Sequence, residues 1–278
     1  MQIPRLELLY RLAAQRDAVP VLFVHGIFSG AWIWEEYFLD WFAAQGYHAY
    51  ALSFRGHGQS SAPDPQGQYQ LAEYVQDLDD AIQTIQQAHG QAPLLVGHSM
   101  GGMVVQRYLS NCQGRGAVLL TSIPPQGLVP LSWASLFTHP LESMMLSRSF
   151  LFPEQMSAED FHRAMFSGPI ELAKIQRWMQ RMVPESMPLI WDMSWLDLPN
   201  VFNVQQTPIE VLGALHDRVI PSSMVTLTAA TYGCTPGWID TGHGVMLDAF
   251  WQKAAVAVDA ALQNLLQRQP AVHFKRTG

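Results

Sequence analysis

The sequence predicts an α/β fold: a doubly wound, mostly parallel sheet flanked by helices, with a helical insertion. Two observations predict it. Short apolar, β-branched runs alternate with longer segments of helical periodicity up to about residue 121, and the alternation resumes at residue 209. Between them, residues 124–205 are helical in character and are repeatedly broken by proline. We therefore expect a core of residues 1–123 and 206–278 and an inserted cap of residues 124–205.

The elements of the first half follow from hydrophobic pattern and turn residues. The segment 31–45 is rich in Trp and Phe at helical spacing and ends at Gly46. The segment 71–89 carries an apolar stripe that includes Tyr74, Leu78 and Ile85. The expected strands are residues 6–12 at an edge, 19–24, 47–54, 94–96 and 117–121, and a further helix is expected around residues 103–109.

The second half returns to the same alternation after the insertion. We expect strands at residues 209–213 and 237–240, helices at 221–232 and 245–267, and a frayed tail after Pro270. The insertion holds 8 of the 13 methionines and 4 of the 9 tryptophans. Methionine fills irregular apolar surfaces, so we expect most of these side chains to pack the cap on the core and a minority to line a pocket.

Composition excludes several classes of protein. The net charge of −7 and the lack of a dense Lys/Arg cluster argue against a nucleic-acid partner. Two cysteines do not make a disulfide framework. The start of the chain lacks the features of a signal peptide, and no run of 18 apolar residues occurs. We expect a cytoplasmic protein that is not stably inserted in a membrane.

The most informative stretch is Gly97-His98-Ser99-Met100-Gly101, which lies between an apolar strand and a helix. Strand, Gly-x-Ser-x-Gly and helix form the setting of a nucleophile elbow. A serine at so tight a turn is under backbone strain and needs neighbours without bulk. The turn presents the Ser99 hydroxyl at the positive end of the following helix. Ser99 is therefore the candidate nucleophile.

A serine hydroxyl needs a base, and the base needs an acid that sets its tautomer. Two later loops supply candidates. Asp217 follows the strand at residues 209–213, and His243 follows the next strand. Serine, acid, histidine is the order expected when each residue sits on a loop after a strand of such a sheet.

With these motifs in place, the chain resembles the α/β-hydrolase family over nearly its whole length. The matching pieces are His25-Gly26-Ile27, the segment from Arg55 to Ser60, the elbow, the segment 213–221, and Gly242-His243. The resemblance implies a Ser-His-Asp triad of Ser99, His243 and Asp217. It also implies an oxyanion hole made by the backbone amides of Ile27 and Met100, and no cofactor. Where many relatives carry an aspartate two residues before the Arg-Gly-His-Gly turn, this chain has Ser53.

Other candidates compete for these roles. Asp240 and Asp248 also flank His243, and we expect Asp248 on the solvent side of the last helix. His216 stands beside Asp217 and is interpreted as a loop residue. His25, His57 and His98 lie in glycine-rich turns, but their spacing matches no common metal-ligand motif, so we expect no metal site.

Three functions fit an activated serine in this setting. The first is a serine hydrolase, of the carboxylesterase or lipase type, that cleaves a carboxylic ester or thioester of a mainly apolar small molecule through an acyl-enzyme. The second is a lyase of the hydroxynitrile-lyase type that uses the same triad. The third is a small-molecule receptor with idle catalysis. The complete triad and oxyanion pair favour the hydrolase. Nucleophilic mechanisms that use aspartate are disfavoured, because Ser99 occupies the elbow.

Overall fold

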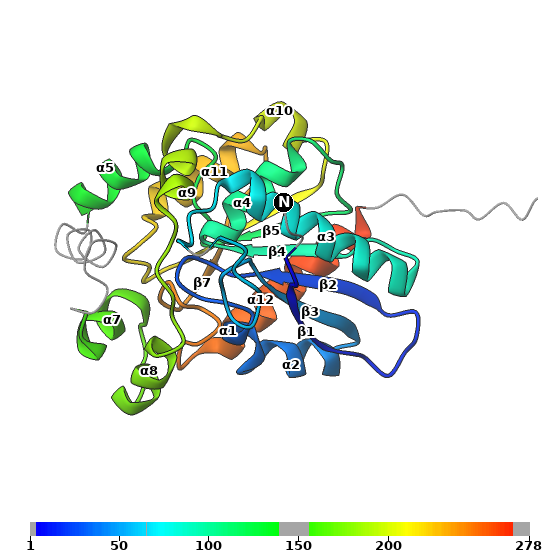
Figure 1. Ribbon diagram of the computed structural model, residues 1–278, viewed down its shortest axis with the longest axis horizontal. Helices are drawn as coiled ribbons and strands as arrows, with labels where there is room; N and C mark the ends of the chain where they lie inside the picture. Colours follow the sequence, from blue (N-terminus) through cyan, green and yellow to red (C-terminus); the bar gives the residue numbers. More distant parts are fainter. Residues whose placement is uncertain (1–3, 65, 139–155, 269–278) are drawn as a thin grey trace, which may run out of the picture.

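The computed structural model describes residues 4–64, 66–138 and 156–268, so the expectations for residues 139–155 and for the tail after Pro270 lie outside the described residues. Seven strands form one sheet in the order β1-β3-β2-β4-β5-β6-β7. Strand β1 runs antiparallel to β3, and all the other pairs are parallel. The strands are β1 (Glu7–Arg11), β2 (Val19–Val24), β3 (Tyr47–Ser53), β4 (Leu94–His98), β5 (Ala117–Leu120), β6 (Ile209–Ala214) and β7 (Gly237–Ile239). The predicted mostly parallel sheet is confirmed (Figure 1).

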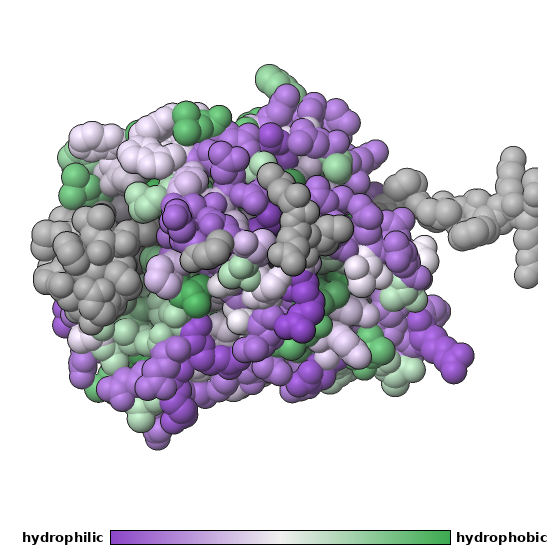
Figure 2. Space-filling view, viewed as in Figure 1, coloured by the Kyte–Doolittle hydropathy of each residue, from purple (hydrophilic) through white to green (hydrophobic). Residues whose placement is uncertain are grey.

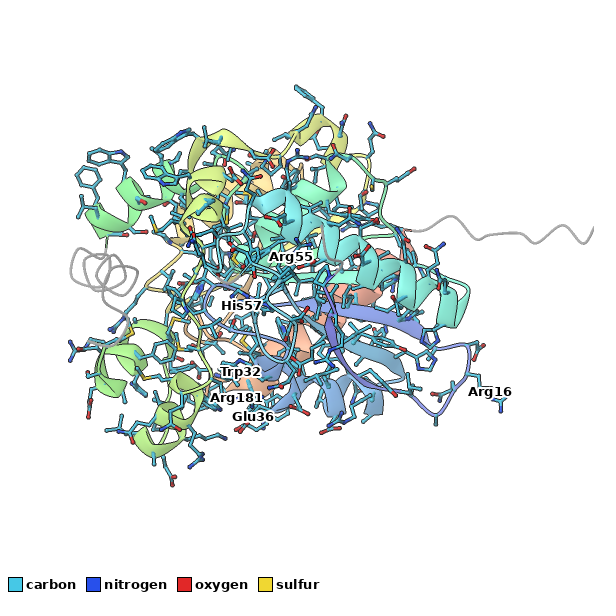
Figure 3. All side chains as sticks on the ribbon, in the orientation of Figure 1. Arg16, Trp32, Glu36, Arg55, His57 and Arg181 are labelled. Atoms are coloured by element: carbon cyan, nitrogen blue, oxygen red, sulfur yellow. The ribbon has the colours of Figure 1, made fainter. Side chains whose placement is uncertain are left out.

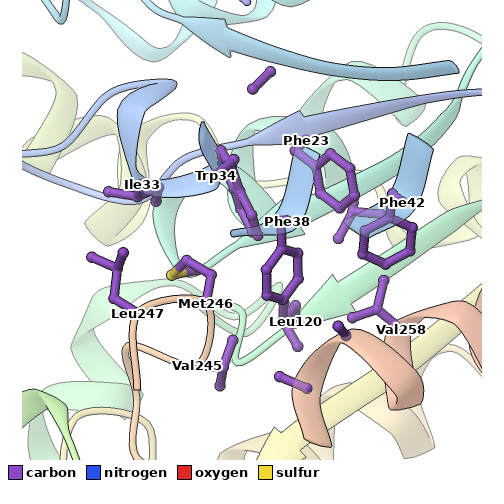
Figure 4. Packing of buried hydrophobic residues seen from close by; sticks show 14 of the residues in the cluster. Phe23, Ile33, Trp34, Phe38, Phe42, Leu120, Val245, Met246, Leu247 and Val258 are labelled. Atoms are coloured by element: carbon purple, nitrogen blue, oxygen red, sulfur yellow. The ribbon is translucent and has the colours of Figure 1, made fainter. Parts of the chain in front are cut away.

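Helices cover both faces of the sheet because successive strand residues point to opposite sides. In β2, Phe23 belongs to the core on the face of α1 (Trp32–Glu35), α2 (Phe38–Ala44) and α12 (Trp251–Gln267), whereas Leu22 belongs to the core on the face of α3 (Leu71–His89), α4 (Met100–Leu109) and α11 (Ser222–Thr231). The Phe23 ring centre lies 4.9 Å from that of Trp34 and 5.0 Å from that of Phe42 (Figure 4). Both cores are continuous, which gives the loops at the strand ends a rigid support.

The helical segment expected at residues 31–45 is two short helices instead of one. The break falls at Tyr37, whose φ of −145° leaves the helical region. The Tyr37 ring stacks on Trp251 at the start of α12, with centroids 4.7 Å apart and the planes nearly parallel. Packing against the last helix therefore overrides the local helical pattern.

The last helix begins at Trp251 and not at residue 245 as expected. Residues 245–250 form turns, and Val245, Met246 and Leu247 are buried. The Asp248 carboxylate Oδ1 accepts a hydrogen bond from the Phe250 amide at 3.1 Å. An aspartate side chain that binds nearby amides in this way favours a turn over a helix.

The stretch between β5 and β6 is called the insertion below, and the part of it that the structure describes is largely helical. It contains α5 (Leu128–Thr138), α7 (Ala158–Met165), α8 (Leu172–Met179), α9 (Met187–Trp191), a π-helical stretch η2 (Asp192–Leu196) and α10 (Val201–Val204). Helices α5 and α9 lie at the upper left of Figure 1, and α7 and α8 lie at the lower left. In the view of Figure 2, hydrophobic residues are interspersed with hydrophilic ones on this side of the surface. None of the helices in the described part of the chain has the length and apolar character needed to cross a membrane.

Candidate active site

Ser99 occupies a strained turn between β4 and α4. Its φ of 54° and ψ of −117° are unusual for any residue with a side chain. The flanking glycines make the turn possible. A Cβ at Gly101 would lie 2.4 Å from the carbonyl oxygen of His25, and one at Gly97 would lie 2.7 Å from that of Gly101. The sequence motif therefore has the local geometry expected of a nucleophile elbow.

Asp217 and His243 are joined by a hydrogen bond in the interior. His243 Nδ1 lies 2.8 Å from Asp217 Oδ2, and the two side chains are 3% and 1% exposed. The other carboxylate oxygen, Oδ1, accepts hydrogen bonds from the amides of Val219 and Ile220, each at 2.8 Å. Because an ionised carboxylate only accepts, Nδ1 of His243 carries the proton and Nε2 is left with a lone pair. A histidine in this tautomer can serve as a base.

His243 and Ser99 line the same cavity, although no hydrogen bond joins their side chains. Such contacts often tighten only when a substrate is bound. His98 supports the histidine loop, since its Nε2 donates to the carbonyl oxygen of His243 at 3.0 Å. Burial and the neighbouring His243 lower the pKa of His98 to about 3, so His98 is a neutral support.

The two other acids beside His243 have different partners. Asp240 is exposed and pairs with His216 at 2.8 Å and with Lys253 at 2.5 Å. Asp248 is fully buried, so the expectation that it faces solvent was wrong. Its Oδ2 accepts from the amides of Gly242 and Ser167 at 3.1 and 2.8 Å. Asp248 thus fastens the histidine loop to the insertion through backbone groups, and Asp217 alone of the three aspartates contacts the ring.

The amides of Ile27 and Met100 flank the elbow. Neither donates a hydrogen bond to another group among the residues that the structure describes. The loop after β2 comes very close to the elbow, because a Cβ at Gly26 would lie 3.1 Å from Cβ of Ser99. Met100 is the first residue of α4, where the helix dipole favours negative charge. Two such amides can stabilise an oxyanion.

A cavity of about 340 Å³ opens at Ser99. Its polar lining consists of Ser29, Ser99, His98 and His243, together with backbone groups, and the rest is apolar. Four of the eight methionines of the insertion line it, as does Trp178. The insertion supplies Met156, Phe161, Ala164, Met165, Phe166, Trp178, Met179, Met182, Val183 and Pro184.

His25, in the glycine-rich turn after β2, makes hydrogen bonds to the backbone of two loops. His25 Nε2 accepts from the amide of Phe54 at 3.1 Å, and its Nδ1 donates to the carbonyl of Gly26 at 2.7 Å. Burial and the nearby His57 lower the pKa of His25 well below its ordinary value. Within residues 4–64, 66–138 and 156–268, no three His, Cys, Asp or Glu side chains are grouped as metal ligands.

Ser53 stands at the position where many relatives carry aspartate, and its hydroxyl makes two hydrogen bonds. Its Oγ donates to Glu7 Oε2 at 2.6 Å and accepts from the amide of Ala31 at 2.8 Å. The carboxylate is therefore supplied by the edge strand β1. These two hydrogen bonds connect the segment after β2 to the end of β3 and to β1.

Sequence reasoning missed one buried group beside this site. Glu185 has a side chain that is 0% exposed and contacts His57 and Tyr74. The stretch Val183-Pro184-Glu185-Ser186 has the composition of an exposed turn, and no local pattern distinguishes it. Only the fold brings Glu185 close to His57, in the loop after β3, and to Phe28, in the loop after β2.

Comparisons with known proteins agree with this architecture. A sequence model described as the alpha/beta hydrolase family matches residues 21–258. The non-heme chloroperoxidase of Streptomyces lividans is 34% identical over 122 residues, which make up 42% of this chain and 41% of that protein. The matched stretch thus spans less than half of that relative.

Solved structures show the same fold at low identity. An esterase from Exiguobacterium antarcticum has a TM-score of 0.68 and 17% identity, with 94% of this chain and 96% of that chain covered. A hydrolase from Pseudomonas aeruginosa has a TM-score of 0.68 and 20% identity, with 92% and 94% covered.

Proposed function

Because the chain belongs to the alpha/beta hydrolase family and is a hydrolase, we propose that it cleaves carboxylic esters or thioesters of mainly apolar small molecules. The observation that carries the proposal is one apolar cavity that contains both Ser99 and His243, with Asp217 bound to the far nitrogen of the histidine. Ser99, His243 and Asp217 then act as nucleophile, base and orienting acid.

In the first half of the reaction, Ser99 Oγ attacks the carbonyl carbon of the ester and its proton passes to His243 Nε2. The electron pair of the carbonyl bond moves onto oxygen, and the amides of Ile27 and Met100 stabilise that oxyanion. When the carbonyl re-forms, the bond to the alcohol or thiol breaks, and His243 gives its proton to the leaving group. The acyl group remains on Ser99.

Water completes the second half along the same path. His243 removes a proton from water, the resulting hydroxide adds to the acyl carbon, and the oxyanion forms again in the same place. Collapse breaks the bond to Ser99 Oγ, which regains its proton from His243, and the carboxylic acid leaves. Asp217 stabilises the positively charged imidazole at each transfer without accepting its proton.

The insertion is rich in Met and Trp, as expected of a cap over the cavity at Ser99. We propose that residues 124–205 form a cap on a core of residues 1–123 and 206–278. Support comes from the side chains that α7 and α8 contribute to the cavity wall, since they exclude water and leave few polar groups for an ionic substrate. An acyl or alcohol part rich in methylene groups fits such a wall.

The test compares two serines of the same cavity. Ser99→Ala should lower the hydrolysis of p-nitrophenyl octanoate by about 10⁴-fold or more, leaving the residual rate that binding alone supplies. Ser29→Ala is the matched control, because Ser29 also lines the cavity but lies outside the elbow. If Ser99→Ala retains the activity of the wild type, another group is the nucleophile and the proposal is wrong.

A further inference from the structure

Glu185 is a fully buried carboxylate that the insertion turns toward the core. Its Oε1 accepts from the hydroxyl of Tyr74 at 2.9 Å and from the amide of Ser186 at 3.2 Å. Its Oε2 lies 3.4 Å from His57 Nε2 and accepts from the amide of Phe28 at 3.4 Å. Three groups from distant parts of the chain, and the amide of the next residue, therefore converge on one side chain.

A buried carboxylate is costly unless it is paired and hydrogen-bonded. His57 supplies the charge. Its Nδ1 donates to the carbonyl of Arg55 at 3.2 Å (Figure 3 labels both residues). Its Nε2 is left to face Glu185. Burial lowers the pKa of His57, but the nearby charge of Glu185 outweighs burial, so this pKa lies above its ordinary value.

The same balance holds for the partner. Burial raises the pKa of the Glu185 carboxyl, but the charge of His57 and the hydrogen bonds of the site outweigh burial and lower it. The other titratable or charged groups that face this pair are His25, Arg55, Tyr74 and Asp77. Of these, Asp77 is already paired with Arg55 at 2.7 Å, so Glu185 is the carboxylate left to pair with His57.

Phe28 is where this pair meets the candidate oxyanion hole. Phe28 directly follows Ile27 and adopts a left-handed backbone with φ of 63°. Its amide donates to Glu185, and its carbonyl oxygen accepts from the amide of Val183 at 3.0 Å. The insertion thus holds both backbone polar groups of a residue whose conformation is unfavourable for a side chain of this size.

We propose that Glu185 is a positioning residue that fixes the loop of Ile27 and Phe28, so that the insertion sets the geometry of the oxyanion hole as well as covering the cavity. This inference rests on the proposed function, because it assigns a purpose to the Ile27 amide. An oxyanion donor must be held in place before the reaction begins, because a small displacement of the donor lowers the rate strongly. Without Glu185, the amide of Phe28 has lost its buried acceptor and the loop is free to relax.

The test separates binding of the transition state from binding of the ground state. An octyl trifluoromethyl ketone adds to Ser99 and carries an oxyanion, whereas octanol fills the cavity and forms no adduct. Glu185→Ala should lower kcat on p-nitrophenyl octanoate by about 10- to 100-fold and raise the Ki of the ketone by a similar factor. KM and the Ki of octanol should change by less than about twofold.

Ser186→Ala is the matched control. Ser186 is buried one residue further along and exchanges hydrogen bonds with the backbone of Tyr69, at 2.8 and 2.5 Å, without touching Phe28. This variant should lower the melting temperature yet leave kcat and the Ki of the ketone within about twofold of wild type. An equal loss of kcat in both variants would mean that general docking of the insertion, and not Glu185, sets the rate.

Glu185→Gln serves where the alanine variant fails to fold. The amide keeps the shape but loses the charge that pairs with His57, and we expect kcat to fall by about 3- to 10-fold with a matching rise in the Ki of the ketone. Unchanged kcat and Ki, or a loss confined to KM and the Ki of octanol, overturns the positioning role. That result in an otherwise active enzyme leaves the proposed function intact, whereas a wild type that is inactive on esters and does not bind the ketone overturns both.

Discussion

Asp217 Oδ2 lies 2.8 Å from His243 Nδ1, and its second oxygen is held by two backbone amides. The carboxylate therefore cannot rotate away from the ring without losing three hydrogen bonds. The loop after β6 therefore fixes the orientation of the His243 imidazole through Asp217. This arrangement also yields a direct prediction for the acid.

Asp217→Asn should lower kcat by about 10³- to 10⁴-fold with little change in KM, because an amide no longer favours the tautomer in which Nδ1 carries the proton. Steady-state kinetics on p-nitrophenyl octanoate, with circular dichroism to check the fold, measures the effect. Asp240→Asn is the control, since this exposed aspartate pairs with Lys253 and His216. A severe loss in Asp240→Asn and a mild one in Asp217→Asn would show that the acid is misassigned.

Substrate length provides the second prediction. The cavity of about 340 Å³ is almost wholly apolar, and each buried methylene is worth about 0.8 kcal/mol. We expect kcat/KM on p-nitrophenyl esters to rise by about two- to fourfold per methylene from acetyl until the cavity is full. A panel from acetyl to dodecanoyl measures this rise. Acetate as the best substrate would contradict the apolar acyl site.

The same panel discriminates among reaction types. It includes a thioester and a cyanohydrin beside the oxygen esters. Activity on the cyanohydrin alone would favour a lyase, and no activity on any member would favour a receptor.

The pair of His57 and Glu185 predicts how stability depends on pH. His57 has a raised pKa, so its contribution is complete below its ordinary value of 6.5 and is lost as pH rises through the raised pKa. Glu185 has a lowered pKa, so its contribution is complete above its ordinary value of 4.5 and is lost as pH falls through the lowered pKa. The difference in melting temperature between wild type and Glu185→Gln should be greatest between these ordinary values and should narrow on either side. A difference that does not vary with pH would contradict the ion pair.

The close packing around Gly101 predicts that Gly101→Ala destabilises the protein much more than Gly116→Ala. A Cβ at Gly101 would lie 2.4 and 2.5 Å from the carbonyl oxygens of His25 and Val24, and a backbone cannot move aside easily. Gly101→Ala should therefore cost about 3 kcal/mol or more of stability and abolish activity. At Gly116 the nearest atom is a side-chain methyl of Leu94 at 3.1 Å, so Gly116→Ala should be mild. Thermal unfolding of both variants measures the difference, and equal effects would contradict the packing argument.

Local patterns predicted the sheet, the elbow and the loops that carry Asp217 and His243, because these depend on short runs of residues. The strands read from β-branched runs agree with the structure, and the glycines around Ser99 are required by contacts within a few residues of it. The family order of serine, acid and histidine directed attention to Asp217. The structure adds that Asp217 and His243 are hydrogen-bonded.

The errors arose where distant contacts override the local pattern. Asp248 was expected at the start of the last helix, on its solvent side, but its carboxylate is buried and accepts hydrogen bonds from the amides of Ser167 and Gly242. Tyr37 interrupts a good helical pattern to stack on Trp251. The burial of Glu185 could not be predicted from the sequence, because it depends on contact with His57, which is distant from Glu185 in the sequence.

The central claim is that Ser99 is the nucleophile, and covalent labelling tests it most directly. Wild type is incubated with an alkyl fluorophosphonate, digested, and mapped by mass spectrometry. We expect one phosphonylated peptide, modified at Ser99, loss of esterase activity in step with labelling, and no labelling of Ser99→Ala. A modified residue other than Ser99, or labelling that persists in Ser99→Ala, would show that Ser99 is not the nucleophile.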